Sequence, residues 1–537
     1  MFRIWPLTIA AAAAAAAGIV GCSQPGSAGS NGQSTLGAGK SSSGKAAHVL
    51  LVCNGSTSHC PHSAHYATVQ SAVDAARAGD WVLIWPGVYH ESNPAHHAGV
   101  WITKPDLHIR GLSRTGVVID GSRGTPGHPC PSGPGLQNFT ARDGLVVWKA
   151  SGVTIQNLTV CNYLAGPGGE DGNEIWWDGG DGSGRIGLKG FAGSYLTATS
   201  FYHPANIHSQ VLAQYGIYAG NAAGPGQIID SYASNMAAGA FYVGACRRAC
   251  DTVLSGDHGT NSAFGYLGTN SGGRLVIKDS VFDDNRTGIA PSSLNNDDAP
   301  PPQDGRCPDS TALSCTLIED NQVSNNNNAN APAYGIAPGV GIGVELDGGQ
   351  FDTVTGNAIT GNGSWGVIAN DSVDTLGHLP HSHCQGGYPN IPARGLCLLP
   401  AHGNLIFGNI FRDNGKFGNA DNSDLATVGL IAGSAVPRNC FYANKAIGSA
   451  LTSAPAGIEQ PGLDGRPCGK PGTGNDAVLL AQLGCATLSG RCKAPHSFYP
   501  RQTWIDYAPL PTLPSMPDPC AGIPKNTFCL TAELVGG

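Results

Sequence analysis

Acidic and amide side chains that could do chemistry recur at one repeated position in the middle of the chain. Glu345 and Asp347 alternate with apolar residues, and Asn370 and Asp371 follow a similar apolar run. Carboxylates held about 5 Å apart can bind a hard cation such as Ca²⁺, or raise the pKa of one partner until it serves as a general acid. Asp and Asn are also common in β-turns, so a structural role is the alternative.

A run of similar residues, 295–298, follows an earlier apolar segment of the same kind. In a repeat array, equal register means an equal face, and insertions on one face often mark the binding face. The candidate catalytic residues on this face are Asp297, Asp298, Glu345 and Asp347. The candidate substrate-binding residues are Asn295, Asn296, Asn370 and Asp371.

A second cluster, residues 170–181, mixes oxygen donors with tryptophans. Asp171, Asp178 and Asp181 are candidate Ca²⁺ ligands, because Asp-rich glycine loops can wrap this ion. Trp176 and Trp177 are candidate substrate-binding residues, because aromatic faces stack on sugar rings. The spacing matches no EF-hand, and the alternative is a loop with tryptophan packed beneath it.

The elements that position these residues form a repeat with a step in the twenties. Short β-type runs and Gly, Asn or Asp turns separate the copies, which is typical of a solenoid made of strands. The copies are Gly216-Ile217-Tyr218, Gly239-Ala240-Phe241, Gly265-Tyr266-Leu267 and Gly288-Ile289-Ala290.

A second repeat ends in asparagine each time. An amide both donates and accepts, so stacked copies can bond to one another along a solenoid. We therefore expect a scaffold role for Asn162, Asn285, Asn326, Asn362 and Asn414.

The N-terminal part of the array gives the most specific resemblance. Thr68 can cap a short helix that Gly79 ends, and the strand-like run 81–85 and Pro86-Gly87-Val88-Tyr89 follow. This string resembles the opening of the pectin-lyase-like right-handed parallel β-helix superfamily. The resemblance implies an all-β solenoid over residues 48–450 with a short capping α-helix. We expect residues 451–537 to form a C-terminal cap and an extended Pro-rich tail, and no second domain.

The resemblance also bears on chemistry. Members of the superfamily include lyases, hydrolases and epimerases of sugar polymers as well as binding proteins without catalysis, so the fold alone does not decide. Lyases of this fold need an Arg or Lys base near calcium, which adds Arg286 to the candidate catalytic residues. Arg286 could instead be a solvated turn residue.

The N-terminus predicts export. Residues 1–21 combine a positive start with an Ala-rich apolar stretch, and they resemble a bacterial lipoprotein signal with lipidation at Cys22. An ordinary signal peptide is the alternative. Residues 22–47 are expected to be a flexible tether.

Without Cys22 the 17 cysteines leave an even number, so disulfides are expected in an exported protein. A solenoid favours local pairs, because residues distant in sequence lie on distant coils. The expected pairs are Cys53–Cys60, Cys130–Cys161, Cys246–Cys250, Cys307–Cys315, Cys384–Cys397, Cys440–Cys468, Cys485–Cys492 and Cys520–Cys529.

Composition narrows the partner. The net charge is −8 and no basic stripe is visible, which disfavours nucleic acid. We expect a monomeric, envelope-anchored protein that binds or processes an acidic or neutral extracellular polysaccharide, with Ca²⁺ as a candidate cofactor. If it is an enzyme, it is a polysaccharide lyase or a glycoside hydrolase. The alternative is a non-catalytic structural or adhesion protein whose partner is another protein.

Overall fold

The structure is a computed structural model. It describes residues 47–56, 60–140, 142–246, 249–295, 315–333, 339–375, 384–391, 393–430, 439–460, 477–487 and 498–530.

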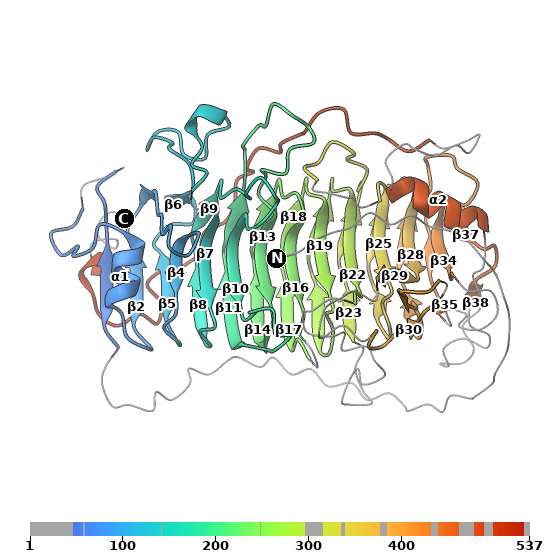
Figure 1. The fold of residues 1–537 in the computed structure, drawn as a ribbon, viewed down its shortest axis with the longest axis horizontal. Coiled ribbons are helices and arrows are strands. Elements are labelled where there is room, and N and C mark those ends of the chain that lie inside the picture. The colour runs from blue at the N-terminus through green and yellow to red at the C-terminus, as the bar shows by residue number, and fades with distance from the viewer. Residues whose placement is uncertain are drawn as a thin grey trace.

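Within these residues the chain winds into a right-handed parallel β-helix with three long parallel sheets (Figure 1). The first sheet contains β1 (Val49–Val52), β2 (Trp81–Ile84), β5 (His108–Gly111), β8 (Val153–Gln156), β11 (Leu188–Ser194), β14 (Ala222–Ile229), β17 (Thr252–Ser255), β20 (Leu275–Lys278), β23 (Thr316–Glu319), β26 (Thr353–Thr355), β32 (Leu405–Phe407), β35 (Cys440–Tyr442) and β38 (Glu459–Gln460). The second sheet contains β3 (Gly87–Tyr89), β6 (Val117–Asp120), β9 (Thr159–Cys161), β12 (Thr197–Thr199), β15 (Tyr232–Ser234), β18 (His258–Thr260), β21 (Val281–Asp283), β24 (Gln322–Ser324), β27 (Ala358–Thr360), β33 (Ile410–Arg412) and β36 (Lys445–Ala446).

The third sheet positions the candidate site. It contains β4 (Ala98–Ile102), β7 (Asp143–Trp148), β10 (Asn173–Asp178), β13 (Tyr215–Gly220), β16 (Gly239–Gly244), β19 (Phe264–Thr269), β22 (Thr287–Ser292), β25 (Ile342–Asp347), β28 (Trp365–Asn370), β34 (Ser423–Val428) and β37 (Ser453–Ala454). A separate antiparallel sheet joins β29 (Ser372–Thr375), β31 (Leu396–Leu399) and β30 (Tyr388–Pro389). The helices are α1 (Val69–Ala75), the 3₁₀ turn η1 (Pro134–Leu136) and α2 (Ala477–Thr487).

Each turn of the solenoid contributes one strand to each long sheet, so coil n pairs in parallel with coil n+1. The expected all-β right-handed parallel β-helix with a short N-terminal capping helix is confirmed. The predicted repeat was wrong in one copy. Aligning Gly239 with Gly216 placed Ala240 beside Ile217, which is one residue away from the observed pairing. Ile217 pairs with Phe241, and Gly239 pairs with Tyr215. Both Ile217 and Phe241 point inward and are fully buried, so the apolar core sets the register.

Asparagine ladders hold the turns of successive coils together. The Asn285 amide donates to the Asn326 Oδ1 at 3.0 Å, Asn326 donates to Asn362 at 3.1 Å, and Asn362 donates to Asn414 at 3.1 Å. The expected scaffold role of these four residues is confirmed. Asn162 differs, since its amide donates to the Pro131 carbonyl and its Oδ1 accepts from Ser200 and Phe201. A further ladder, which was not predicted from the sequence, runs through Asn321, Asn357, Asn409 and Asn444.

Helix α1 closes the N-terminal end of the rod. Thr68 caps it by accepting from the Ser71 N–H, and the Glu91 carboxylate accepts from the N–H groups of Val69 and Gln70. The Gln70 side chain in turn donates to the Trp101 carbonyl and accepts from its N–H, which satisfies the backbone of the first strand in the third sheet.

The C-terminal tail, residues 498–530, runs back along the whole rod and is coloured red in Figure 1. It begins where the Phe498 N–H donates to Asn419 and ends where Phe528 packs with Leu51 and Leu83. Between these points Arg114 donates to the Pro514 carbonyl at 3.0 Å, and Arg110 donates to the Ala521 carbonyl at 2.7 Å.

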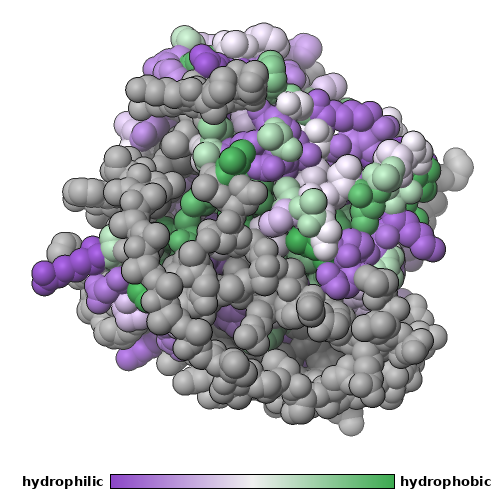
Figure 2. All heavy atoms as spheres, turned by 90° about the vertical axis from the view of Figure 1, so that its right-hand side faces the viewer, coloured by the Kyte–Doolittle hydropathy of each residue, from purple (hydrophilic) through white to green (hydrophobic). Residues whose placement is uncertain are grey.

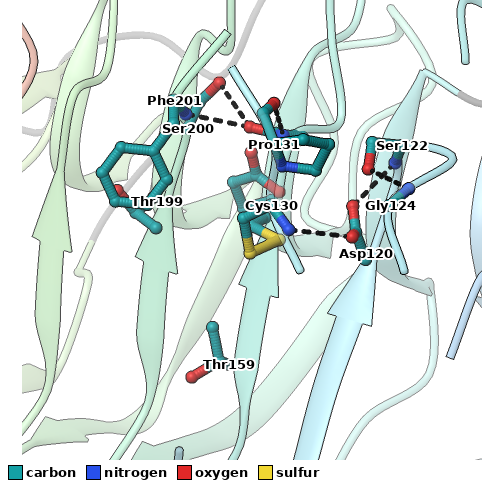
Figure 3. The surroundings of a disulfide bond; sticks show 12 residues. Asp120, Ser122, Gly124, Cys130, Pro131, Thr159, Thr199, Ser200 and Phe201 are labelled. Carbon is teal, nitrogen blue, oxygen red and sulfur yellow. Dashed lines mark hydrogen bonds between the residues drawn. A yellow bond between two sulfur atoms is a disulfide. The ribbon is translucent and has the colours of Figure 1, made fainter. Parts of the chain in front are cut away.

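Five expected disulfides are confirmed: Cys53–Cys60, Cys130–Cys161, Cys246–Cys250, Cys384–Cys397 and Cys520–Cys529. Cys315, Cys440 and Cys485 are also disulfide-bonded. Their expected partners Cys307, Cys468 and Cys492 lie outside the described residues. Residues 122–140 form a long connection between β6 and β7. The Cys130–Cys161 bond joins this connection to β9 beside Asp120 (Figure 3).

The predicted signal peptide, Cys22 and all but the last residue of the tether lie outside the described residues. Among the residues that the structure does describe, no helix is both long and apolar enough to cross a membrane.

We predict that Asn326→Ala lowers the free energy of unfolding by about 2–4 kcal/mol, because it leaves buried groups of Asn285 and Phe282 without their side-chain partner. Urea unfolding followed by circular dichroism measures the change. The exposed Asn206→Ala variant is the control and should cost less than about 1 kcal/mol. Equal losses for the two variants would contradict a ladder role.

Candidate functional site

Outward-facing side chains of the third sheet line up in a column across the coils. Parallel pairing places Trp176 beside Tyr218, Tyr218 beside Tyr242, and Tyr242 beside Leu267. We call this line the central column; it begins at Trp101 and Val146 and continues through Ala290, Glu345, Ile368 and Ala426. Adjacent members stand about 4.8 Å apart, the strand spacing.

The first half of this face is aromatic. The rings of Trp176 and Tyr218 stack with centroids 5.0 Å apart and planes inclined by 6°, and Tyr242 meets Tyr218 edge to face at 4.6 Å. Six rings form this part of the face; five of them are partly exposed, and the Tyr242 ring is buried. We call this set the aromatic surface: Trp101, Trp148, Trp176, Tyr215, Tyr218 and Tyr242.

Glycines two residues after the tyrosines let the tyrosine rings lean along their own strands. A Cβ on Gly220 would meet the Tyr218 hydroxyl at 2.7 Å, and one on Gly244 would meet the Tyr242 hydroxyl at 2.6 Å. Any larger residue at these positions would push the rings away from the strand. The Tyr-x-Gly pattern therefore shapes the aromatic surface.

Polar groups rim the aromatic surface. The His96 ring stacks on Trp101 with centroids 4.5 Å apart, and the Lys149 ammonium lies 5.1 Å from the Trp148 ring centroid while pairing with Asp181. At the starts of β4 and β10, next to His96, the His97 Nδ1 lies 3.6 Å from the Asp171 carboxylate. Flat rings edged by such donors and acceptors suit a ligand with apolar faces and hydroxyl edges.

Of the two predicted tryptophans, only Trp176 lies on this surface. Trp177 points into the solenoid, where it is fully buried and its Nε1 donates to the Val153 carbonyl at 3.2 Å. Its predicted substrate-binding role was wrong, because adjacent residues of a strand face opposite sides. Sequence reasoning missed Trp101, Trp148 and three tyrosines, although Tyr218 stood in the repeat that it recognised.

Glu345 and Asp347 lie on the same face of β25, two residues apart, and Glu345 occupies the central column. Burial and the neighbouring Asp347 carboxylate raise the pKa of Glu345 from its ordinary 4.5 to about 8. Burial also raises the pKa of Asp347, against hydrogen bonds from Ser372 and from Asn370, whose Nδ2 donates at 2.8 Å. The arrangement brings a carboxyl that is protonated at neutral pH next to a more acidic one.

Two other predicted substrate-binding residues, Asp371 and Asn295, accept hydrogen bonds from the backbone of neighbouring loops. Asp371 accepts from the N–H groups of Ala401 and Leu430, and burial raises its pKa to about 7. Asn295 accepts from the Cys384 N–H at 2.7 Å. Their side chains therefore hold neighbouring segments in place. Asn296, Asp297 and Asp298 lie outside the described residues.

Arg286 is fully buried in the turn before β22, and its Nη1 donates to the Ala329 carbonyl at 2.8 Å. Burial lowers its pKa to about 10. The predicted catalytic role was wrong, since a fully buried guanidinium cannot reach a substrate on the outer face.

The three predicted calcium ligands have separate partners. Asp171 pairs with His97, Asp178 accepts from the Gly180 N–H, and Asp181 pairs with Lys149. Asp171 precedes β10 and Asp178 is its last residue, so the length of the strand, about 17 Å, separates them. In the described parts of the chain, only Asp120, Cys130 and Cys161 gather their ligand atoms closely, and the two cysteines form a disulfide. Asp171, Asp178 and Asp181 therefore do not fit a calcium centre.

Comparison with known proteins adds fold information only. No protein-family model and no curated protein matches the sequence. Similar solved structures include an alginate lyase from Paenibacillus sp. str. FPU-7, with 14% identity over 68% of this chain and 95% of its own and a TM-score of 0.35. The A-module of a mannuronan C-5 epimerase from Azotobacter vinelandii has 12% identity over 73% and 88%, with a TM-score of 0.32.

A third similar structure is the tailspike protein of E. coli bacteriophage HK620 in complex with pentasaccharide, with 10% identity over 75% of this chain and 67% of its own and a TM-score of 0.42. The parallel β-helix of this chain is shown by its own three long parallel sheets. Identities and TM-scores this low carry no information about this chain's ligand or chemistry.

We predict that Glu345→Gln becomes increasingly stable relative to the wild-type protein as pH rises from 4.5 to about 8. The folded wild-type protein keeps a proton that the unfolded chain releases in this window, so wild type loses stability there and the variant does not. The gain at pH 8 relative to pH 4.5 should exceed about 1 kcal/mol, because one pKa unit corresponds to about 1.4 kcal/mol.

Urea unfolding at both pH values measures this gain, with the exposed Glu170→Gln as control. A difference between Glu345→Gln and wild type that does not change with pH would contradict the raised pKa.

Proposed function

We propose that this protein binds an extracellular polysaccharide along the aromatic surface. The observation that carries the proposal is the ladder of partly exposed rings at strand spacing, led by the stacked pair Trp176 and Tyr218. Rings of this kind pack against the apolar faces of sugars, and the polar rim can bind hydroxyl groups. From β4 to β19 the face spans about 24 Å at the strand spacing, which suits a chain-like ligand.

A second candidate function is hydrolysis of the bound glycan. It is favoured by the pair Glu345 and Asp347, in which burial keeps Glu345 protonated at neutral pH. Glu345 would protonate the leaving oxygen, and Asp347 would act as base or nucleophile. We propose hydrolysis ahead of the lyase reaction because a protonated carboxyl beside a more acidic one is the pair that glycoside hydrolysis uses.

The proposed location is the outside of the cell envelope. Disulfides are typical of exported proteins, and the five described bonds support export. We propose that Cys22 carries a lipid anchor and that the protein acts as a monomer. A non-catalytic adhesion role with a protein partner is the alternative.

We predict that Trp176→Ala and Tyr218→Ala each weaken glycan binding about tenfold or more, because truncating a central aromatic contact costs about 1–2 kcal/mol or more. A glycan array finds the ligand, and calorimetry measures its affinity. Trp504→Ala is the control, since Trp504 is 59% exposed on the C-terminal tail. Unchanged binding in both surface variants, or no glycan bound at all, would contradict the proposal.

If the protein is a hydrolase, release of reducing ends from the bound polymer should be lost in Glu345→Gln while affinity stays within a few fold. EDTA should leave this activity unchanged, since acid–base hydrolysis by two carboxyl groups needs no metal ion. Activity in Glu345→Gln equal to wild type would remove Glu345 as the acid. An increase in absorbance at 235 nm instead would indicate a lyase.

A further inference from the structure

The central column changes character along the rod. Trp101, Trp176 and Tyr218 are partly exposed, with Val146 and Tyr242 buried beside them, whereas Ile368 on a late coil is 0% exposed. Large aromatic side chains therefore reach the surface over the early coils, whereas the late members Ile368 and Ala426 belong to a buried apolar cluster.

Helix α2 provides part of this cover. Its residues Leu479 and Leu483 share one buried apolar cluster with Ile368, Ala426 and Val428 of the third sheet. Ile368 and Ala426 are members of the central column, so α2 lies on the line that the aromatic residues begin (Figure 1).

Further contacts fix α2 in this position. The Gln482 Oε1 accepts from the Asp421 N–H at 3.1 Å, Tyr499 of the tail joins the apolar cluster, and Cys485 is disulfide-bonded. Figure 2 looks onto this end of the rod, where the described residues mix hydrophobic and hydrophilic surface.

The other end of the aromatic surface has a different arrangement. Helix α1 meets β4 through the Gln70 side chain, which bonds to the backbone of Trp101. The Trp101 ring stays partly exposed and stacks with His96 and Trp148. A ligand lying on the surface can therefore continue past Trp101, but in the other direction it meets α2, which packs against β28 and β34.

We propose that the binding surface is one-ended, and that the protein recognises the terminus of a polysaccharide chain rather than an internal stretch. The proposal rests on the proposed glycan binding. The terminal sugar lies near Glu345, the column member before the strands that α2 covers, and the rest of the chain extends over the aromatic rings toward Trp101. Hydrolysis at Glu345 would then remove short units from one chain end.

Binding capacity tests this arrangement. The probe is whichever of polygalacturonate, alginate, xylan and mixed-linkage β-glucan binds most tightly, immobilised at equal mass either intact or after partial acid hydrolysis. If termini are recognised, saturating binding per mass rises by the same factor as the number of chain ends. Capacity that stays constant while ends multiply overturns the proposal and leaves glycan binding intact, whereas failure of all four polymers to bind overturns both.

A pair of variants on α2 connects the effect to the helix. Leu479→Glu places a charge in the buried cluster and should make capacity less dependent on chain ends. Val478→Glu changes the neighbouring residue, which is 52% exposed, and should behave as wild type. The capacity measurement on the wild-type protein decides the proposal even if Leu479→Glu fails to fold. If Leu479→Glu folds and its binding capacity still depends fully on the number of chain ends, α2 does not end the binding surface.

Discussion

Parallel backbone pairing between successive coils is the constraint on which this structure depends. It sets neighbouring residues of a column about 4.8 Å apart, whatever their separation in sequence. Trp176, Tyr218 and Tyr242 become one stacked surface only because β10, β13 and β16 pair in this register. The same pairing carries that column to Glu345 and beneath α2, so the binding surface and its covered end follow from one geometric rule.

The register is fixed by side chains at several positions along each coil. Inward residues such as Ile217 and Phe241 bury the apolar core, and a slip of one residue would turn them to solvent. Asparagine ladders fix the turns, because each amide bonds to the next coil. Glycines two residues after the tyrosines leave room for the rings to lean along their strands, so the scaffold and the site share one repeat.

Much of the fold could be predicted because its signals are local. The Thr68 cap, the recurring asparagines and the nearby cysteine pairs each lie within a short segment or recur at a visible interval. The site was harder to predict because it depends on strand phase. Trp176 and Trp177 are neighbours in sequence, yet one faces outward and the other lies in the core. The cover by α2 joins residues far apart in the chain, and no sequence spacing indicates it.

The most direct measurement is a crystal structure of the protein with the oligosaccharide that binds most tightly. The account predicts sugar rings stacked on Trp176 and Tyr218, with one chain end toward Glu345 and the other free beyond Trp101. Ordered sugar found only on the outer face of the first or second sheet would contradict it.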